Sequence, residues 1–88
     1  MIKVQDFPDG EYVDRELVLI KVGVDAKSRP EVMQICDIFR AKIVDMAHKA
    51  LTIELTGGES KIVAFLELME PFGIRDLTRT GKVAMPRK

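Results

Sequence analysis

Residues 28–46 constrain the fold of this chain more than any other stretch. Apolar side chains recur there at positions i, i+3, i+4 and i+7, which is typical of a helix with one buried face. They are Val32, Ile35, Cys36 and Phe39. An apolar strand over 41–46 follows with almost no loop. The stretch therefore predicts an amphipathic helix that runs directly into a strand.

A second helix, predicted over 60–70, has the same internal spacing and also leads toward a strand. Its apolar face comprises Ile62, Phe65, Leu66 and Met69. Strands are predicted at 15–24, 41–46, 51–56 and 74–80. Residues 83–85 extend the last strand past Gly81. This order predicts an α+β, ferredoxin-like βαββαβ sandwich, in which a four-stranded antiparallel sheet carries both helices on one face.

The first helix has a recognisable start signal. Ser28 and Glu31 have the spacing of a capping box, in which the Ser28 hydroxyl accepts a hydrogen bond from the backbone of Glu31. Pro30 is tolerated in the first turn, where amides have no partner within the helix. We therefore expect Ser28 to cap this helix.

The charges cancel overall but are unevenly placed. The 88 residues include 14 basic and 14 acidic side chains. A neutral chain has no general field for nucleic acid or anionic membrane, so neither is expected as a partner. In the predicted fold, the first and last strands are antiparallel neighbours. Asp14 and Glu16 should then lie near Arg79 and Lys82 and neutralise much of their charge.

The central strand is apolar on both faces. Residues 17–20 are Leu-Val-Leu-Ile, whereas both helices cover only one face of the sheet. A second apolar face on so small a domain predicts a partner surface. We therefore expect a homodimer or a larger homo-oligomer with the open sheet face buried.

No catalytic, cofactor-binding or metal-ligating residue is predicted. His48 is the only histidine, lies in a predicted turn and has no second ligand at metal-binding spacing. Cys36 is the only cysteine, which excludes an internal disulfide and fits a reducing compartment. It lies on an apolar stripe and is expected in the core. From these patterns alone, the chain is a small α+β binding or assembly module.

Four separated segments resemble one known family. They are ArgGluLeuValLeuIleLysVal (15–22), IlePheArgAlaLysIleValAsp (38–45), LeuThrIleGluLeuThrGly (51–57) and GlyIleArgAspLeuThrArgThrGlyLysValAlaMet (73–85). Together they resemble the small, regulatory subunit of acetolactate synthase, also called acetohydroxyacid synthase. The resemblance covers residues 13–85 in order and without a large gap.

The resemblance implies a domain organisation. In that family an N-terminal ACT domain and a linker precede a C-terminal ferredoxin-like domain, and this chain is similar to the C-terminal half. Residues 1–13 then correspond to a linker and a remnant of a preceding ACT domain, 14–85 to the ferredoxin-like domain, and 86–88 to a tail. The family's amino-acid-binding turn belongs to the N-terminal half, so no effector-binding residue is assigned.

The resemblance also implies a function. It is that of a non-catalytic regulatory domain in branched-chain amino-acid biosynthesis, which dimerises and contacts the catalytic (large) subunit in the cytoplasm. The family's thiamine diphosphate, magnesium and flavin belong to that large subunit, so this chain is expected to hold no cofactor. Because the end of the last strand is basic, we expect Arg75, Arg79 and Lys82 to contact the partner.

Two alternatives remain open at this point. One is a stand-alone ACT-like sensor that binds an amino acid or another small molecule in a dimer cleft. The other, with the least support, is a small enzyme in which His48 meets Asp45 or Asp37.

Overall fold

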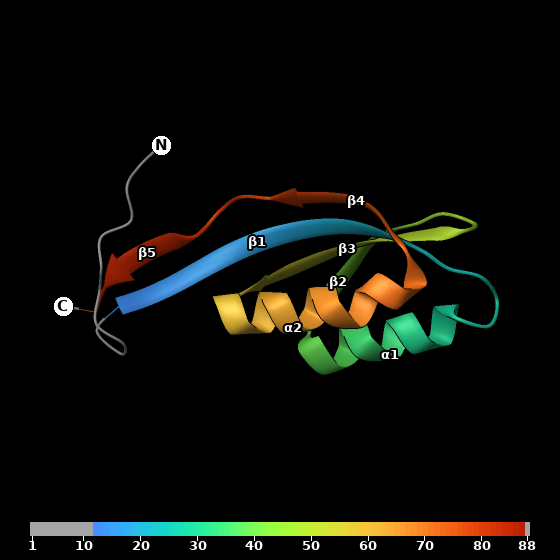
Figure 1. The fold of residues 1–88 in the computed structure, drawn as a ribbon, viewed down its shortest axis with the longest axis horizontal. Coiled ribbons are helices and arrows are strands. Elements are labelled where there is room, and N and C mark those ends of the chain that lie inside the picture. Colours follow the sequence, from blue (N-terminus) through green and yellow to red (C-terminus); the bar gives the residue numbers. More distant parts are fainter. Residues whose placement is uncertain (1–11, 88) are drawn as a thin grey trace.

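The computed structural model describes residues 12–87, which form an antiparallel sheet with two helices on one face (Figure 1). The strands are β1 (Tyr12–Gly23), β2 (Lys42–Met46), β3 (Ala50–Gly57), β4 (Ile74–Arg79) and β5 (Val83–Pro86). The helices are α1 (Arg29–Phe39) and α2 (Glu59–Met69), and the short 3-10 helix η1 (Glu70–Phe72) leads into β4. The ferredoxin-like α+β fold is confirmed. Of the predicted linker segment, residues 1–11 lie outside the described residues.

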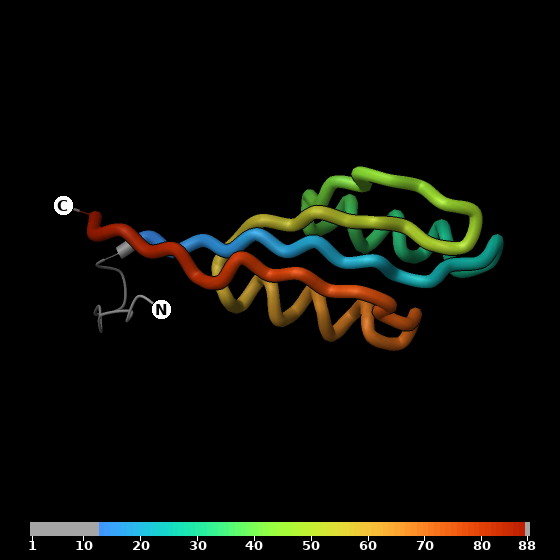
Figure 2. Tube along the Cα trace, turned by 90° about the horizontal axis from the view of Figure 1, so that it is seen from above, coloured from blue at the N-terminus to red at the C-terminus, as the bar shows by residue number. Residues whose placement is uncertain are grey.

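The sheet has five strands, one more than the sequence predicted. Four of them follow the order β2-β3-β1-β4, and β5 pairs with the outer end of β1 (Figure 2). The expected extension of the last strand is therefore a separate strand. Gly81 has a φ of +84°, which glycine adopts without steric cost, and the chain re-enters the sheet as β5. Residues 12–15 of β1 and β5 form a ribbon that projects past α2, which we call the arm.

The core lies between the sheet and the helices. Residues of β1 and β3 at every second position point toward the helices, as the two-residue repeat of a strand requires. The fully buried ones are Val18, Ile20, Val22, Leu51, Ile53 and Leu55. The helices contribute Val32, Cys36, Ile62, Phe65 and Met69. The rings of Phe39 and Phe65 meet edge to face at 5.3 Å between centroids. Both predicted apolar stripes are confirmed as core.

The start of α1 differs from the predicted capping box. Ser28 makes no side-chain cap to the helix. Its hydroxyl accepts from the backbone N–H of Asp25 at 2.9 Å, and Asp25 Oδ1 accepts from the N–H of Ser28 at 2.7 Å. The capping prediction is wrong because the Ser28 side chain bonds to Asp25 and not to the helix. The backbone N–H of Arg29 likewise bonds to the carbonyl of Asp25.

The end of α1 explains its direct passage into β2. Arg40 adopts a left-handed conformation with φ of 59°. Its N–H bonds to the carbonyl of Asp37, and the N–H of Ala41 bonds to that of Cys36. These two bonds form a Schellman motif, which ends a helix within two residues. Glycine usually occupies the position that arginine holds here.

The open face of the sheet is more polar than the β1 sequence suggests. Leu17 and Leu19 of β1 point away from the helices, and Leu19 is 36% exposed. The residues paired beside them on that face are polar. They include Thr56 next to Leu17, and Glu54 and Thr78 on either side of Leu19. The second apolar face is therefore a narrow stripe along β1.

Candidate functional site

Arg79, at the end of β4, is bound to a carboxylate of its own chain. Its Nε donates to Glu16 Oε2 at 2.9 Å and its Nη2 to Glu16 Oε1 at 2.6 Å. Glu16 is the buried charged residue of β1, at 8% exposure. The hydrogen bond and the charge of Arg79 lower the pKa of Glu16, although burial acts in the opposite direction. A bidentate arginine–carboxylate pair fixes the guanidinium in one orientation.

Lys82 lies between the arm and α2. Its Nζ donates to Glu59 Oε1 at 3.0 Å and lies 4.0 Å from Asp14 Oδ2. Since β4 and β5 both pair with β1, the predicted neighbourhood of Asp14 and Glu16 with Arg79 and Lys82 is confirmed. Much of the positive charge at this end is thereby neutralised within the chain.

The arm exposes apolar side chains on the face opposite these cations, the face that also carries Leu17 and Leu19. The register pairs Val13 with Met85 and Arg15 with Val83, so all four lie on one face of the arm. Met85 and Val83 are 70% and 67% exposed. These side chains form an exposed apolar patch on the arm.

Arg75, the third predicted contact, lies apart from the other two. It stands near the start of β4, about 13 Å along the strand from Arg79. The register of β4 against β1 passes from Asp76 to Ile74, so Arg75 occupies a β-bulge. The structure therefore brings Arg79 and Lys82 together at the arm and leaves Arg75 at the opposite end.

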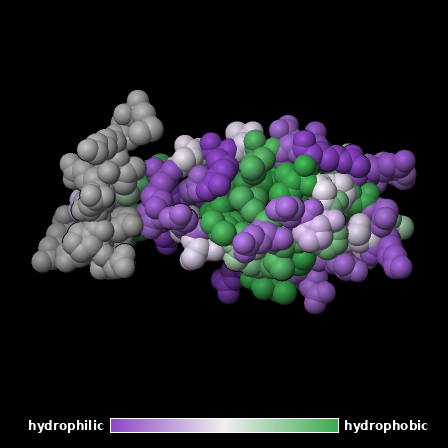
Figure 3. Space-filling view, in the orientation of Figure 1, coloured by the Kyte–Doolittle hydropathy of each residue, from purple (hydrophilic) through white to green (hydrophobic). Residues whose placement is uncertain are grey.

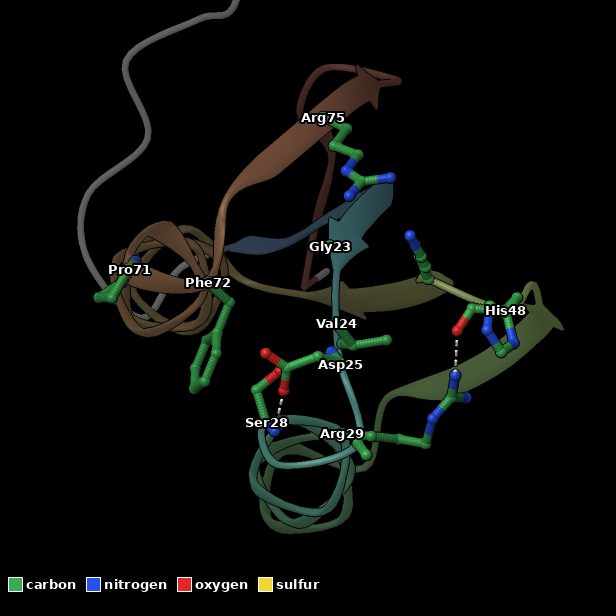
Figure 4. A pocket seen from close by; sticks show the side chains of 11 residues that line it. Gly23, Val24, Asp25, Ser28, Arg29, His48, Pro71, Phe72 and Arg75 are labelled. Carbon is green, nitrogen blue, oxygen red and sulfur yellow. Dashed lines mark hydrogen bonds between the residues drawn. The ribbon is translucent and has the colours of Figure 1, made fainter.

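Arg75 borders a hollow of about 750 Å³ at that end of the sheet (Figure 4). Three connections meet there: the loop from β1 to α1, the turn from β2 to β3, and the passage from η1 to β4. The lining includes Asp25, Arg29, His48, Lys49 and Phe72. No sequence pattern predicts this group as a site, because its members are distant in sequence and the bulge has no local signal.

A further apolar surface lies along the edge strand. Figure 3 shows hydrophobic side chains gathered between β4 and α2. Leu77 pairs with Ile20 and so faces the helix side, yet it is 42% exposed. Leu68 of α2 is also exposed. The two helices therefore leave part of β4 uncovered.

Residues with possible chemical roles are scattered. Within residues 12–87, no group of three or more His, Cys, Asp or Glu side chains could hold a metal ion. Cys36 is buried as predicted, and burial raises the pKa of its thiol to about 11. None of the described helices is long and apolar enough to cross a membrane.

The strand order and helix placement define a ferredoxin-like α+β domain with a projecting arm. Residues 15–88 match the family model described as the small subunit of acetolactate synthase. The chain belongs to this family, which confirms the resemblance seen in its segments.

Individual relatives agree with the family match. The chain is 51% identical over 88 residues to the acetolactate synthase small subunit of Aquifex aeolicus, covering 99% of this chain and 46% of that protein. It is 49% identical to the chloroplastic acetolactate synthase small subunit 2 of Arabidopsis thaliana, covering 100% of this chain and 18% of that protein. The crystal structure of the small subunit from Thermotoga maritima superposes with a TM-score of 0.87 at 40% identity, covering 94% of this chain and 51% of that one. The chain thus spans about half the length of the two bacterial relatives and 18% of the plant protein.

Proposed function

We propose that this chain acts as a non-catalytic regulatory domain of acetolactate synthase in branched-chain amino-acid biosynthesis. It works by assembly: it dimerises and helps the small subunit contact the catalytic subunit, in the cytoplasm. The observation that carries the proposal is the family match over residues 15–88, supported by the fold shared with the Thermotoga maritima small subunit. A stand-alone sensor is not favoured, because the chain aligns over its whole length with small subunits of this enzyme.

The stripe of Leu17 and Leu19 on the open face is the proposed dimer surface. It runs along the central strand, and the residues paired beside Leu19, Glu54 and Thr78, are polar. An apolar centre with a polar surround is the usual anatomy of a protein interface. If the stripes of two copies packed against each other, they would bury apolar area that the helices do not cover.

The arm is the proposed contact with the catalytic subunit. Val83 and Met85 supply exposed apolar area on one face, and Arg79 and Lys82 lie at its base on the helix-facing side, with side chains 39% and 31% exposed. Their ion pairs within the chain hold both cations in place, so less side-chain entropy is lost when a partner binds. Arg75 lies too far away to share this surface.

Acetolactate formation by the cognate catalytic subunit tests this function. The rate should change saturably as the chain is added at a fixed concentration of catalytic subunit. The matched control is the chain carrying Met85→Glu, which places a charge on the arm and should require a higher concentration for the same effect. A rate that stays constant over the whole titration would refute the regulatory role.

A further inference from the structure

The hollow at the end of the sheet has a framework of backbone hydrogen bonds. Val24 N–H donates to the carbonyl of Lys49 and Gly23 N–H to that of Gly73, both at 2.9 Å. The guanidinium of Arg29 donates to the backbone carbonyl of His48 at 2.7 Å. These bonds tie the three connections together. The hollow is therefore a formed feature of the fold, within the size range of small-ligand sites.

Its charge is positive after the internal bonds are counted. Three cations, Arg29, Lys49 and Arg75, line it, against the single carboxylate of Asp25. Asp25 Oδ1 already accepts from the backbone N–H groups of Lys27 and Ser28, and hydrogen bonding with Ser28 lowers its pKa. The Asp25 carboxylate therefore bonds within its own loop, and the Arg29 guanidinium bonds to the turn from β2 to β3.

Two of these cations keep their hydrogen-bonding capacity. Among residues 12–87, neither the Arg75 guanidinium nor the Lys49 ammonium makes a side-chain hydrogen bond or an ion pair. Arg75 is the extra residue of the β-bulge, and a bulge changes the direction of the side chain of its extra residue. Figure 4 shows Arg75 reaching from β4 toward Gly23 at the end of β1.

Gly23 leaves space for that guanidinium. A Cβ at this position would lie 3.0 Å from Arg75 Nε and 3.1 Å from Arg75 Nη2. Such contacts are too short for ordinary packing, so a side chain at residue 23 would displace Arg75. The glycine and the bulge together hold one cation against the wall of the hollow.

The opposite part of the lining is apolar. Phe72 is half-buried and packs against the core, and Val24 is buried. Figure 4 shows Phe72 on the side of Asp25 and Ser28, with the end of β1 at Gly23 between it and Arg75. A small ligand would therefore meet the cations on the Arg75 side and not the Phe72 ring.

We propose that this hollow binds a small anion, a carboxylate or a phosphate ester, on its cationic side. Arg75 and Lys49 hold the anionic group. Arginine suits this role because its planar fork matches a carboxylate or phosphate with two parallel hydrogen bonds. The site lies at the end of the sheet opposite the arm, so it extends the proposed function without depending on it.

Titration of the chain with butanoate, followed by amide ¹H–¹⁵N spectra at constant ionic strength, tests the site. We expect saturable shifts centred on Gly23, Val24 and Lys49, with a Kd of about 1 mM for so small a probe. Butyramide, the neutral analogue, should cause no such shifts. Inorganic phosphate, a second small anion, should cause saturable shifts at the same residues.

Variants identify the contacts. Arg75→Gln should raise the Kd for butanoate about tenfold, because a hydrogen bond to a charged group is lost. Lys42→Gln removes an exposed cation of β2 outside the hollow and should leave the Kd unchanged. Lys49→Gln provides a second test if Arg75→Gln disturbs the fold, which the dispersion of the same spectra reports.

Three results would overturn the proposal. They are no saturable shift at the hollow, equal binding of butyramide, or an unchanged Kd in both Arg75→Gln and Lys49→Gln. Each result leaves the assembly function untouched, since that function is read from the catalytic rate.

Discussion

The ion pair of Glu16 and Arg79 connects β1 to the end of β4. Glu16 is almost fully buried, so its charge depends on the two hydrogen bonds from Arg79. An unpartnered buried carboxylate would be costly, because no water replaces the lost bonds. The same pair orients Arg79 at the base of the arm.

This pair should make stability depend on pH. The folded pKa of Glu16 is lowered below its usual value of 4.5, so its stabilising contribution is full above that pH. The contribution is lost as the pH falls through the lowered folded pKa. Arg79→Gln should reduce the free energy of unfolding by about 1 kcal/mol at neutral pH, since solvent partly screens the exposed arginine.

Urea unfolding of both proteins between neutral and strongly acidic pH provides the measurement. The difference between wild type and Arg79→Gln should shrink below pH 4.5. A difference that is constant over this range would show that the pair contributes by packing and not by charge. Lys42→Gln is the control for removing an exposed cation.

At the scale of single elements, the junction between α1 and β2 stores local strain. Arg40 occupies a left-handed conformation that L-residues with a Cβ adopt at a cost. Glycine is the usual residue there, although it also gains freedom in the unfolded chain. Arg40→Gly should therefore raise the free energy of unfolding by about 0.5–1 kcal/mol.

Thermal or urea unfolding of Arg40→Gly and Arg40→Ala separates conformation from side-chain contacts. Alanine keeps the steric cost and should leave stability close to wild type. If both variants are destabilised equally, the arginine side chain makes a contribution that outweighs its backbone strain.

The elements with strong periodicity could be predicted from the sequence. Two helices with a repeated stripe and one alternating strand, 51–56, gave the order of the fold and therefore the proximity of Glu16 and Arg79. The arm could not be predicted as such, because β5 is short and depends on pairing with a distant part of β1. The capping box failed because Ser28 had a competing partner in Asp25, three residues earlier.

The hollow depended on features without a sequence signal. A bulge at Arg75 arises from a register shift between two strands, and that shift is set by packing over the whole sheet. Arg75 lies beside Gly23 although the two residues are far apart in the sequence. Residue types alone therefore identified Arg75 as a basic side chain but not what surrounds it.

At the scale of the whole molecule, the open sheet face should hold a dimer. Leu19→Lys places a charge at the centre of the stripe beside Glu54, which can pair with it in the monomer. The fold should survive, while the dimer Kd should rise at least about tenfold, because two desolvated lysines would face each other.

Light scattering coupled to size exclusion gives the mass of each variant. Val44→Lys, at an exposed position of the edge strand β2, is the matched control and should remain dimeric. A wild-type chain that is monomeric at every concentration, or a Leu19→Lys chain with unchanged mass, would contradict this interface.

Binding of the chain to the catalytic subunit of acetolactate synthase tests assembly most directly. Calorimetric titration should show saturable binding with a Kd of about 1 μM. Met85→Glu on the arm should weaken it about tenfold. Ile38→Glu, which replaces a side chain that is likewise 70% exposed but lies on α1, should not. No binding at about 100 μM, or equal weakening by both variants, would contradict assembly through the arm.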